Sequence, residues 1–293
     1  MAFVDTPLTA EVREAVRRHW GIEIDRPERL HGGQESASYR LGDQVVRIGP
    51  KWRADVELAW SFALATRVAA FVPEVVAPCP AGDGRCAVRV GGRPVSVWPY
   101  VAGGRGDDRD NDQRWQAADL LARLHRALAQ MHTGPWPDVR PGPGPEPEPE
   151  VGDPELDRWL AAFDARHPAQ QPLHGDFHAG NTLVRRGRIV ALLDWDDVFL
   201  GPPERELAWA AWEWGDGPST LDVGPAMAFV IRYATAGGTA TPVGEEELAQ
   251  LVRERLRMEV GYNRAAWRDG APRDADDLEY EAPQLEAFQS LRP

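Results

Sequence analysis

The sequence has little of several residue types that commonly mark a function. It contains one lysine, Lys51, and two cysteines, Cys79 and Cys86. The cysteines flank a turn-rich segment, 80–85, and the further ligands that a metal centre would need are not apparent there. Because disulfides are rare in reducing compartments, we expect two free thiols.

Long hydrophobic runs are also absent from the sequence. No apolar stretch approaches the roughly 20 residues that a membrane-spanning helix needs. The opening residues, MAFVDTPLTAEVREAV, lack the basic stretch and apolar core of a secretory signal. We therefore expect a cytoplasmic protein without a membrane partner. With 293 residues, 43% of them hydrophobic, the chain is long enough to bury a large core.

Basic residues are outnumbered by acidic ones, 33 to 46, and the formal net charge is −13. A nucleic-acid partner is therefore not expected, since proteins of that class present a basic face to the phosphates. Two explanations of the acidic balance stay open. It provides a solvated surface, or it attracts a cationic small molecule.

The hydrophobic patterns predict two regions of different structure. Residues 9–20 have helical spacing, with Thr9 as N-cap. Strands are expected within 29–50, 86–90 and 94–101, with an apolar helix over 52–71 between them. Beyond them we expect helices over 113–132, 156–166, 203–214, 222–236, 244–268 and 276–290, and an exposed proline-rich loop at 134–155. This pattern predicts an α+β fold with an N-terminal lobe, 1–101, and a C-terminal lobe, 102–293.

The most informative segment is 173–194, LHGDFHAGNTLVRRGRIVALLD. Two short apolar runs, separated by a polar string, predict a β-hairpin between Asn181 and Asp194. The hairpin would return Asp194 towards Asn181, with Asp176 on the loop before it. Carboxylate and amide oxygens suit Mg²⁺, which shares its other positions with phosphates and water.

The same residues have a spacing that phosphoryl transfer uses. In the catalytic loop of protein kinases, H-R-D-x-x-x-x-N, the base and a metal ligand are five residues apart, as are Asp176 and Asn181. Upstream, Gly32-Gly33 forms a turn whose backbone can approach phosphates closely. The spacing and the turn together favour a kinase.

A positive side chain for the phosphates is expected on the third strand. Arg47 lies within that strand pattern, whereas Lys51 follows it after Gly-Pro. Glu57, on the next helix, is expected to pair with Arg47 and hold it in place, with Asp55 as the competing partner. The alternatives are a solvated Arg47 and acids that only favour the helix N-terminus.

HGDFHAGN and LLDW resemble motifs of the aminoglycoside phosphotransferase superfamily, which comprises small-molecule kinases with a two-lobed, protein-kinase-like fold. The resemblance extends from about Leu30 to Trp209. It implies Asp176 as the catalytic base and Asn181 and Asp194 as Mg²⁺ ligands.

Three other segments resemble nucleotide-binding parts of that family. GGQESASYRL resembles the turn that covers the phosphates, which implies roles for Gly33 and Ser36, and VVRIGP resembles the strand that carries Arg47. WPYVAGG resembles the hinge that binds the purine of ATP or GTP. That likeness implies contacts from the C=O of Pro99 and the N–H of Val101.

We expect the acceptor to be a small hydroxylated molecule of antibiotic type, with a cationic acceptor favoured by the acidic C-terminal helices. A metabolic kinase of amino alcohols, homoserine or sugars, a nucleotide-binding pseudokinase and a metallohydrolase based on H-G-D-F-H are the alternatives. The protein is expected to be a monomer or a homodimer. The residues expected to contact the acceptor are Asp197, Glu206, Trp209, Glu213 and Tyr262.

Overall fold

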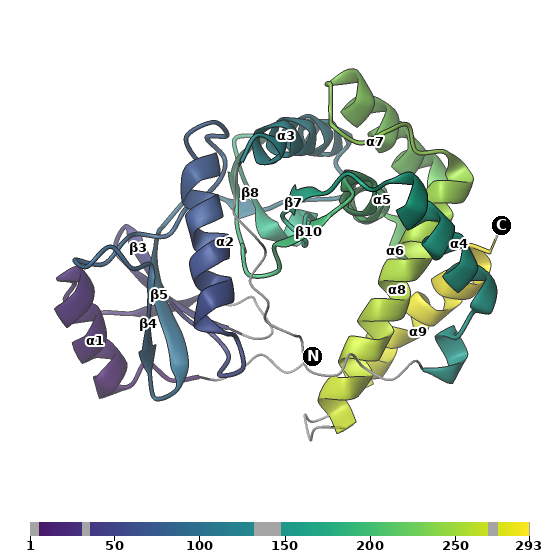
Figure 1. The fold of residues 1–293 in the computed structure, drawn as a ribbon. Coiled ribbons are helices and arrows are strands. Elements are labelled where there is room, and N and C mark those ends of the chain that lie inside the picture. Colours follow the sequence, from purple (N-terminus) through teal and green to yellow (C-terminus); the bar gives the residue numbers. More distant parts are fainter. Residues whose placement is uncertain (1–5, 31–35, 132–147, 269–274, 293) are drawn as a thin grey trace.

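The computed structural model describes residues 6–30, 36–131, 148–268 and 275–292. Its N-terminal part contains a five-stranded antiparallel sheet, and the rest of the chain is mainly helical (Figure 1). The fold is therefore α+β, as predicted. In their order across the sheet, the strands are β1 (Glu28–Leu30), β2 (Ala37–Leu41), β3 (Gln44–Ile48), β5 (Arg93–Pro99) and β4 (Ala87–Val90).

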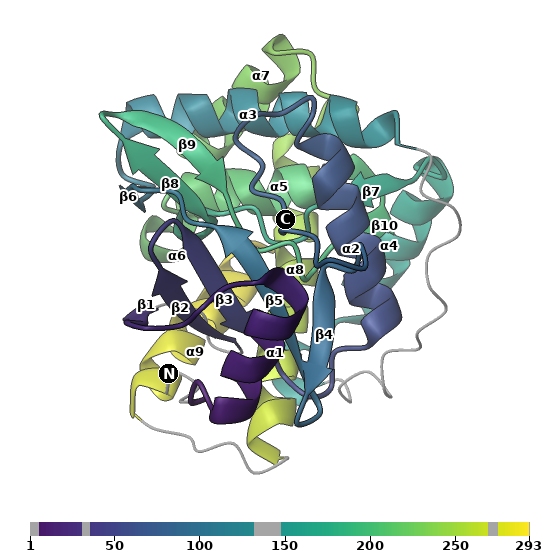
Figure 2. The same ribbon diagram turned by 90° about the vertical axis from the view of Figure 1, so that its left-hand side faces the viewer.

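Helices lie on the two faces of this sheet (Figures 1 and 2). Helix α1 (Ala10–Trp20) buries Val16 in one hydrophobic cluster, which also contains Val97 of β5. Helix α2 (Asp55–Val68) contributes to a second cluster, which contains Trp98. Because neighbouring residues of a strand point to opposite faces, the sheet separates the two clusters.

Local signals define the ends of α1 as the sequence predicts. The Thr9 side chain accepts a hydrogen bond from the backbone N–H of Val12 at 3.3 Å. Gly21 follows the helix with φ of 70°, and its N–H donates to the C=O of Arg17 at 2.9 Å. A hydroxyl cap at the start and a left-handed glycine at the end are the usual boundaries of such a helix.

The helical part surrounds short strands. The predicted hairpin consists of β8 (Thr182–Arg185) and β9 (Arg188–Leu192), and β6 (Gly104–Arg105) pairs with β8. A further pair, β7 (Gln171–Leu173) and β10 (Phe199–Gly201), was not expected. The helices and 3₁₀ turns around these strands are α3 (Asn111–Ala129), η1 (Pro149–Val151), α4 (Pro154–Arg166), η2 (Ala179–Asn181), α5 (Pro203–Trp214), α6 (Gly217–Thr220), α7 (Val223–Thr235), α8 (Glu245–Arg268) and α9 (Ala275–Ser290).

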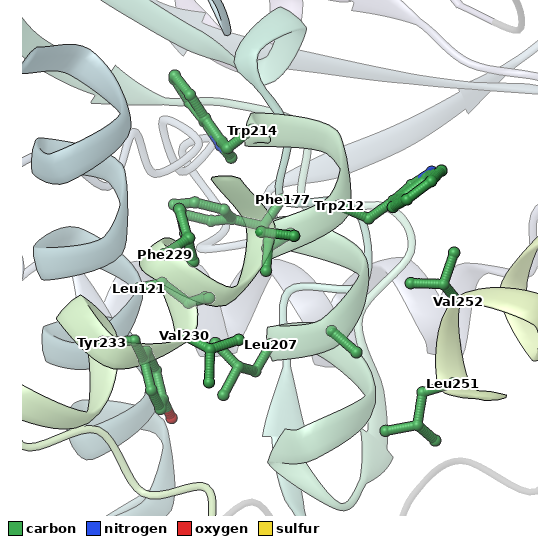
Figure 3. Packing of buried hydrophobic residues seen from close by; sticks show 14 of the residues in the cluster. Leu121, Phe177, Leu207, Trp212, Trp214, Phe229, Val230, Tyr233, Leu251 and Val252 are labelled. Carbon is green, nitrogen blue, oxygen red and sulfur yellow. The ribbon is translucent and has the colours of Figure 1, made fainter. Parts of the chain in front are cut away.

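The largest hydrophobic cluster lies in the helical part. Trp212 and Trp214 of α5 and Phe229 of α7 are fully buried in it, together with Phe177 (Figure 3). Large aromatic side chains bury about 150–250 Å² each, so they contribute strongly to such a core. Phe177 directly follows Asp176, and the core therefore anchors the loop that carries the candidate base.

The proline-rich segment differs in part from its prediction. Residues 134–147 lie outside the described ranges, but Pro149–Val151 form a 3₁₀ turn and Val151 is fully buried. Asp153 then caps α4 by accepting from the N–H of Glu155 at 2.9 Å. Composition misled the prediction here, because proline is well tolerated in the first turn of a helix.

None of the helices in the described residues combines the length and the apolar character needed to cross a bilayer.

Candidate active site

A buried network supports the loop that carries Asp176. Glu206 on α5 is only 4% exposed, and its carboxylate accepts from the backbone N–H of His174 at 3.1 Å and from that of Gly175. His125 Nε2 lies 2.8 Å from the same carboxylate, and its Nδ1 lies 2.7 Å from the hydroxyl of Tyr233. Burial alone would raise the pKa of Glu206, but the bonds from His125 and Gly175 lower it.

These bonds do not support the prediction that Glu206 contacts the acceptor. Both of its oxygens are engaged beneath the loop, so its role is to hold the backbone of residues 174–175. His174 contributes from the other side, since its Nε2 lies 2.9 Å from the C=O of Leu193. A buried carboxylate is stable only when donors satisfy it, which explains why Glu206 faces backbone N–H groups and His125.

Asp176 and Asn181 lie together, as their spacing predicts. Asn181 Nδ2 donates to the C=O of Asp176 at 2.9 Å and to its Oδ2 at 2.6 Å. His178 Nε2 lies 3.3 Å from Oδ2, and Arg255 Nη2 lies 3.8 Å from Oδ1. Burial would raise the pKa of Asp176, but the bond and charge of His178 and the charge of Arg255 lower it to about 2. Asp176 is therefore ionised at neutral pH.

The hairpin returns Asp194 to this loop. The N–H of Leu193 donates to the C=O of Asn181 at 2.8 Å, which ties the end of β9 to the turn η2. Asp194 itself has φ of 58°, in the left-handed region that residues other than glycine rarely adopt. Backbone strain of this kind concentrates at functional sites.

Arg47 connects the sheet to this position. Its Nη2 lies 2.9 Å and 3.0 Å from the two carboxylate oxygens of Asp194, and 3.0 Å from Oδ2 of Asp196. Burial opposes the charge of Arg47, but the two carboxylates raise its pKa further above the ordinary value. Asp196, which the sequence analysis did not single out, is buried, and its burial raises its pKa to about 6 although Arg47 opposes the shift.

The predicted pair between Arg47 and Glu57 is not formed. Glu57 Oε2 instead accepts from the backbone N–H of Ala54 at 3.2 Å, at the first turn of α2. The competing acid, Asp55, pairs with Arg89 at 2.7 Å. Each acid thus stabilises the start of α2 or its surroundings, where a helix favours negative charge. Arg47 finds its partners across the cleft, which sequence spacing could not reveal.

The groups around Asp194 fit a divalent cation. Because Asn181 directs its Nδ2 to Asp176, its Oδ1 stays available as an acceptor. Oδ1 of Asp196 is buried and has no hydrogen-bond partner among the described residues. A set of oxygen atoms suits Mg²⁺, which commonly takes one or two protein carboxylates and completes its shell with phosphates and water. In the same residues, no group of three or more His, Cys, Asp or Glu is arranged to hold a metal.

A cavity of about 360 Å³ lies between the sheet and the hairpin. Val45 and Trp98 of the sheet and Leu183 and Leu193 of the hairpin region give it apolar walls. Apolar walls with a few polar groups are typical of small-ligand sites. The polar side chains lining it include Ser36, Arg47, Asn181 and Asp194.

Strand β5 presents a backbone edge to this cavity. Its pairing with β4 ends at Ser96, and on the same edge the C=O of Val97 accepts from the N–H of Cys79 at 2.7 Å. Beyond Val97 that edge forms no backbone hydrogen bond with the described residues. The N–H of Tyr100 points the other way and donates towards β3 at 2.7 Å. Since backbone groups alternate sides along an extended chain, the C=O of Pro99 and the N–H of Val101 point to the open edge. Both residues line the cavity.

Two residues expected to contact the phosphates have different outcomes. Ser36 is 3% exposed, lines the cavity, and its Oγ has no hydrogen-bond partner in the described part of the chain. A buried hydroxyl without a partner is available to a ligand. Gly33 lies outside the described residues.

A larger cleft of about 1100 Å³ lies beside Asp176. All five of the predicted acceptor residues line it: Asp197, Glu206, Trp209, Glu213 and Tyr262. Burial, with the negative charges of Glu259 and Asp176, raises the pKa of Glu213 to about 7, although His178 opposes the shift. Asp197 forms an ion pair with Arg53, and both carboxylate oxygens of Glu206 accept from the loop. Trp209, Glu213 and Tyr262 therefore stay the acceptor candidates.

The cleft also contains a pair that the sequence analysis missed. Arg255 and Glu259 lie one turn apart on α8, with 2.8 Å between Nη2 and Oε1. The Arg255 guanidinium also lies 5.5 Å from the centre of the Trp209 ring. A spacing of four residues between opposite charges is common on helices, so it does not identify a site. Arg255 is assigned to the site only because the tertiary structure brings it close to Asp176.

Comparisons with known proteins bear on the family and on the fold. The model of the phosphotransferase enzyme family (APH) matches residues 26–251. Among curated proteins, no relative matches the chain. The folds of several solved kinases are similar, and because their identities lie below 25%, that similarity concerns the fold alone.

Three of these structures cover nearly the whole chain. The amicoumacin kinase hAmiN, in complex with AMP-PNP and Ca²⁺, has a TM-score of 0.71 at 13% identity and covers 96% of this chain and 92% of its own. A microcompartment-associated aminopropanol kinase has a TM-score of 0.70 at 16% identity, with 95% and 96% covered. The macrolide 2′-phosphotransferase MphH from Brachybacterium faecium has a TM-score of 0.58 at 21% identity, with 94% and 97% covered.

The family match covers the sheet, the hairpin and the loop with Asp176, and stops within α8. The lobed, protein-kinase-like fold that the resemblance implied is thus confirmed. The chain belongs to the APH phosphotransferase enzyme family.

Proposed function

We propose that the protein transfers the γ-phosphoryl group of ATP or GTP to a hydroxyl group of a small molecule, with Asp176 as catalytic base. The main support is the environment of Asp176. Its carboxylate is ionised, faces a cleft of about 1100 Å³, and lies beside Asn181, Asp194 and Arg47, the groups that would hold the phosphates and their cation.

The proposed step transfers one proton and one phosphoryl group. The acceptor oxygen attacks the γ-phosphorus while its proton passes to the carboxylate of Asp176. The bond between the γ-phosphorus and the oxygen bridging to the β-phosphate breaks, and the nucleoside diphosphate leaves. Asp176 later releases the proton to water. Positioning and charge stabilisation provide most of the rate in such transfers.

In this proposal a metal site, an arginine and a cavity would together hold the nucleotide. Asn181 and Asp194 would bind Mg²⁺, which neutralises charge on the phosphate oxygens when bound. Arg47, held by Asp194 and Asp196, would contact the phosphates with a planar guanidinium. The purine would occupy the cavity of about 360 Å³ against the edge at Pro99 and Val101. We place the lobe boundary at 101/102, directly after this edge.

We propose an acceptor of antibiotic type that carries a cationic group. Glu213 and Glu259 stand in the cleft beside Trp209 and Tyr262, and aromatic and acidic side chains together bind ammonium groups. The volume of the cleft favours an acceptor larger than an amino alcohol, since the pockets that bind drug-sized ligands measure about 300–1,000 Å³. The fold similarity to an aminopropanol kinase keeps an amino alcohol as the second candidate.

A coupled assay of nucleoside diphosphate release tests the activity. Hydroxylated antibiotics, amino alcohols and sugars are supplied with ATP or GTP and Mg²⁺. We expect turnover with at least one class, and a loss of about 10²-fold or more in kcat for Asp176→Asn at unchanged nucleotide affinity. Tyr39→Phe, remote from the cleft in the sheet, serves as a matched control.

Other outcomes would support the alternatives. Nucleotide binding without turnover of any acceptor would identify a pseudokinase. Tightly held zinc or iron in the purified protein, with chelator-sensitive hydrolysis, would identify a metallohydrolase. If the protein prefers amino alcohols to antibiotics, the proposed acceptor class is wrong but the proposed reaction is unchanged.

A further inference from the structure

His178 lies in the loop beside Asp176, and its two ring nitrogens make separate contacts. It begins the 3₁₀ turn η2, where Nδ1 accepts from the backbone N–H of Gly180 at 3.1 Å. Its Nε2 lies 3.3 Å from Oδ2 of Asp176. A metal-ligand role is not needed to explain either contact.

The first contact determines where the ring carries its proton. An acceptor nitrogen of a neutral imidazole has no hydrogen, so the bond from Gly180 places the proton of His178 on Nε2. Nε2 is the ring nitrogen that lies 3.3 Å from the carboxylate of Asp176. The carboxylate raises the pKa of His178, but full protonation would set an N–H at Nδ1 against the N–H of Gly180.

Gly180, within the turn, is small enough to leave room for the His178 ring. A Cβ added at Gly180 would lie 2.7 Å from Cε1 and 3.0 Å from Nδ1 of His178. Real Cβ atoms essentially never come within 3.0 Å of another side chain, so a larger residue would displace the imidazole. The position of the His178 ring therefore explains why residue 180 of the H-A-G-N sequence is glycine.

The two oxygens of Asp176 are consequently different. Oδ2 faces two donors, Asn181 Nδ2 at 2.6 Å and His178 Nε2 at 3.3 Å. Oδ1 accepts no hydrogen bond from the described residues, and Arg255 is 3.8 Å away. A carboxylate oxygen that accepts a hydrogen bond and lies near a second donor is a weaker base than its free partner.

We propose that His178 is a positioning residue that holds Oδ2 of Asp176 through Nε2–H, so that Oδ1 receives the proton of the acceptor hydroxyl. The inference rests on the proposed kinase function and deepens it. His178 keeps its own proton throughout, and the acceptor proton moves only to Oδ1. The charged groups around the pair are Glu213 on α5, Arg255 on α8, Asp194 after β9, and His174 in the same loop.

Two conservative substitutions separate positioning from a purely structural role. The amide of asparagine lies as many bonds from Cα as Nδ1, so His178→Asn keeps the acceptor for Gly180 but loses the donor to Asp176. The amide nitrogen of glutamine lies as far from Cα as Nε2, so His178→Gln keeps the donor and weakens the cap. Ala179→Ser, at the residue that follows His178 in the same turn, is the matched control.

Positioning predicts that kcat falls about tenfold or more in His178→Asn while KM for nucleotide stays unchanged, because a bond to a charged group is lost. His178→Gln should stay within about threefold of wild type. Gly180→Ala should resemble His178→Asn, since it displaces the ring. The reverse order, with asparagine active and glutamine inactive, would show that His178 only caps the turn and would overturn the proposal.

A measurement independent of turnover distinguishes failure of this inference from failure of the kinase proposal. Nitrogen-15 shifts of the His178 ring should show the Nε2–H tautomer, and Asp176→Asn should move the Nε2 signal. Detection of the Nδ1–H tautomer would contradict the inference, even if the protein is an active kinase. If the Nε2–H tautomer is found but no acceptor is turned over, the contact between His178 and Asp176 stands and the kinase proposal is rejected.

Discussion

Arg47 shows at the residue scale how one side chain serves two purposes. The chain has a single lysine, and the strand position expected for a phosphate-binding cation holds an arginine. Its Nη2 contacts the carboxylates of both Asp194 and Asp196. A guanidinium can contact phosphate with its remaining N–H groups while it neutralises these acids.

Removal of Arg47 should make stability depend on Mg²⁺. Arg47→Ala leaves two acids without their cation, and we expect the free energy of unfolding to fall by about 3 kcal/mol in EDTA. Added Mg²⁺ should recover more stability in this variant than in wild type, because the ion replaces the lost charge. Urea unfolding with and without Mg²⁺ measures the effect.

Arg85→Ala, on an exposed pair with Asp83, provides the control for this experiment. It should change stability by less than about 1 kcal/mol and leave the response to Mg²⁺ unchanged. An equal response to Mg²⁺ in wild type and Arg47→Ala would contradict the shared site.

Glu213 should make stability depend on pH. Its pKa is raised to about 7 in the folded protein from an ordinary value of 4.5, so the folded state binds the proton more tightly. The stabilisation is complete below pH 4.5 and is lost as the pH rises through 7. Glu213→Gln should therefore match wild type near pH 4.5 and be more stable by about 1–3 kcal/mol at pH 8.

Thermal unfolding across this pH range tests the expectation for Glu213. Glu155→Gln, at an exposed position of α4, is the control and should follow wild type at every pH. A constant difference between Glu213→Gln and wild type from pH 4.5 to 8 would refute the assignment.

At the scale of elements, the loop between β7 and η2 depends on a close approach by a second chain segment. Gly175 has φ of 88°, and an added Cβ would overlap the carbonyl oxygen of Asp197. The backbone N–H of Gly175 also donates to Glu206. The loop therefore needs glycine for conformation, for space and for its bond to α5.

Gly175→Ala should cost about 3 kcal/mol or more of stability and abolish turnover, because the loop must move away from residue 197. Gly187 provides a matched control, since it has φ of 72° in the β8–β9 turn with open space around it. Gly187→Ala should cost only about 1 kcal/mol, the usual cost of left-handed backbone. Equal costs in urea unfolding would show that the crowding at Gly175 is unimportant.

At the scale of the whole molecule, ligand binding should couple the sheet to the hairpin. The 360 Å³ cavity takes walls from both, so a nucleotide bound there contacts both regions. Arg53, just before α2, also bonds the C=O of Asp196 at 2.7 Å. The two regions are therefore linked at the site itself.

A non-hydrolysable ATP analogue with Mg²⁺, at 100 times its Kd, should raise the free energy of unfolding by about 2.7 kcal/mol. We expect one cooperative transition in calorimetry, because both lobes hold the ligand. Asp194→Asn should lose most of this gain at the same ligand concentration. Tyr262→Ala, in the acceptor cleft, should retain it, and a loss there would contradict the separation of the two subsites.

The candidate site was predictable where its parts are local. Asp176 and Asn181 lie five residues apart in the segment that ends with η2. The hairpin that returns Asp194 follows from two apolar runs separated by a polar string, so local sequence alone brings these residues together. The sequence did not reveal the hydrogen-bond partners of Glu57 and Glu206, for one physical reason. A carboxylate binds the nearest donors that its burial requires, and these were the N–H groups of residues 54, 174 and 175.

By itself, the sequence determined most of the elements and the spacing of the polar groups in the loop, because helix caps, strand alternation and the D-x-x-x-x-N spacing act over a few residues. Only the tertiary structure decided which distant charges meet: Arg47 with Asp194 and Asp196, and Arg255 with Asp176. Those contacts join segments far apart in the chain, and their geometry depends on how helices and sheet pack. The cleft beside Asp176 is built from such contacts, whereas the pattern of the loop lies within a few consecutive residues.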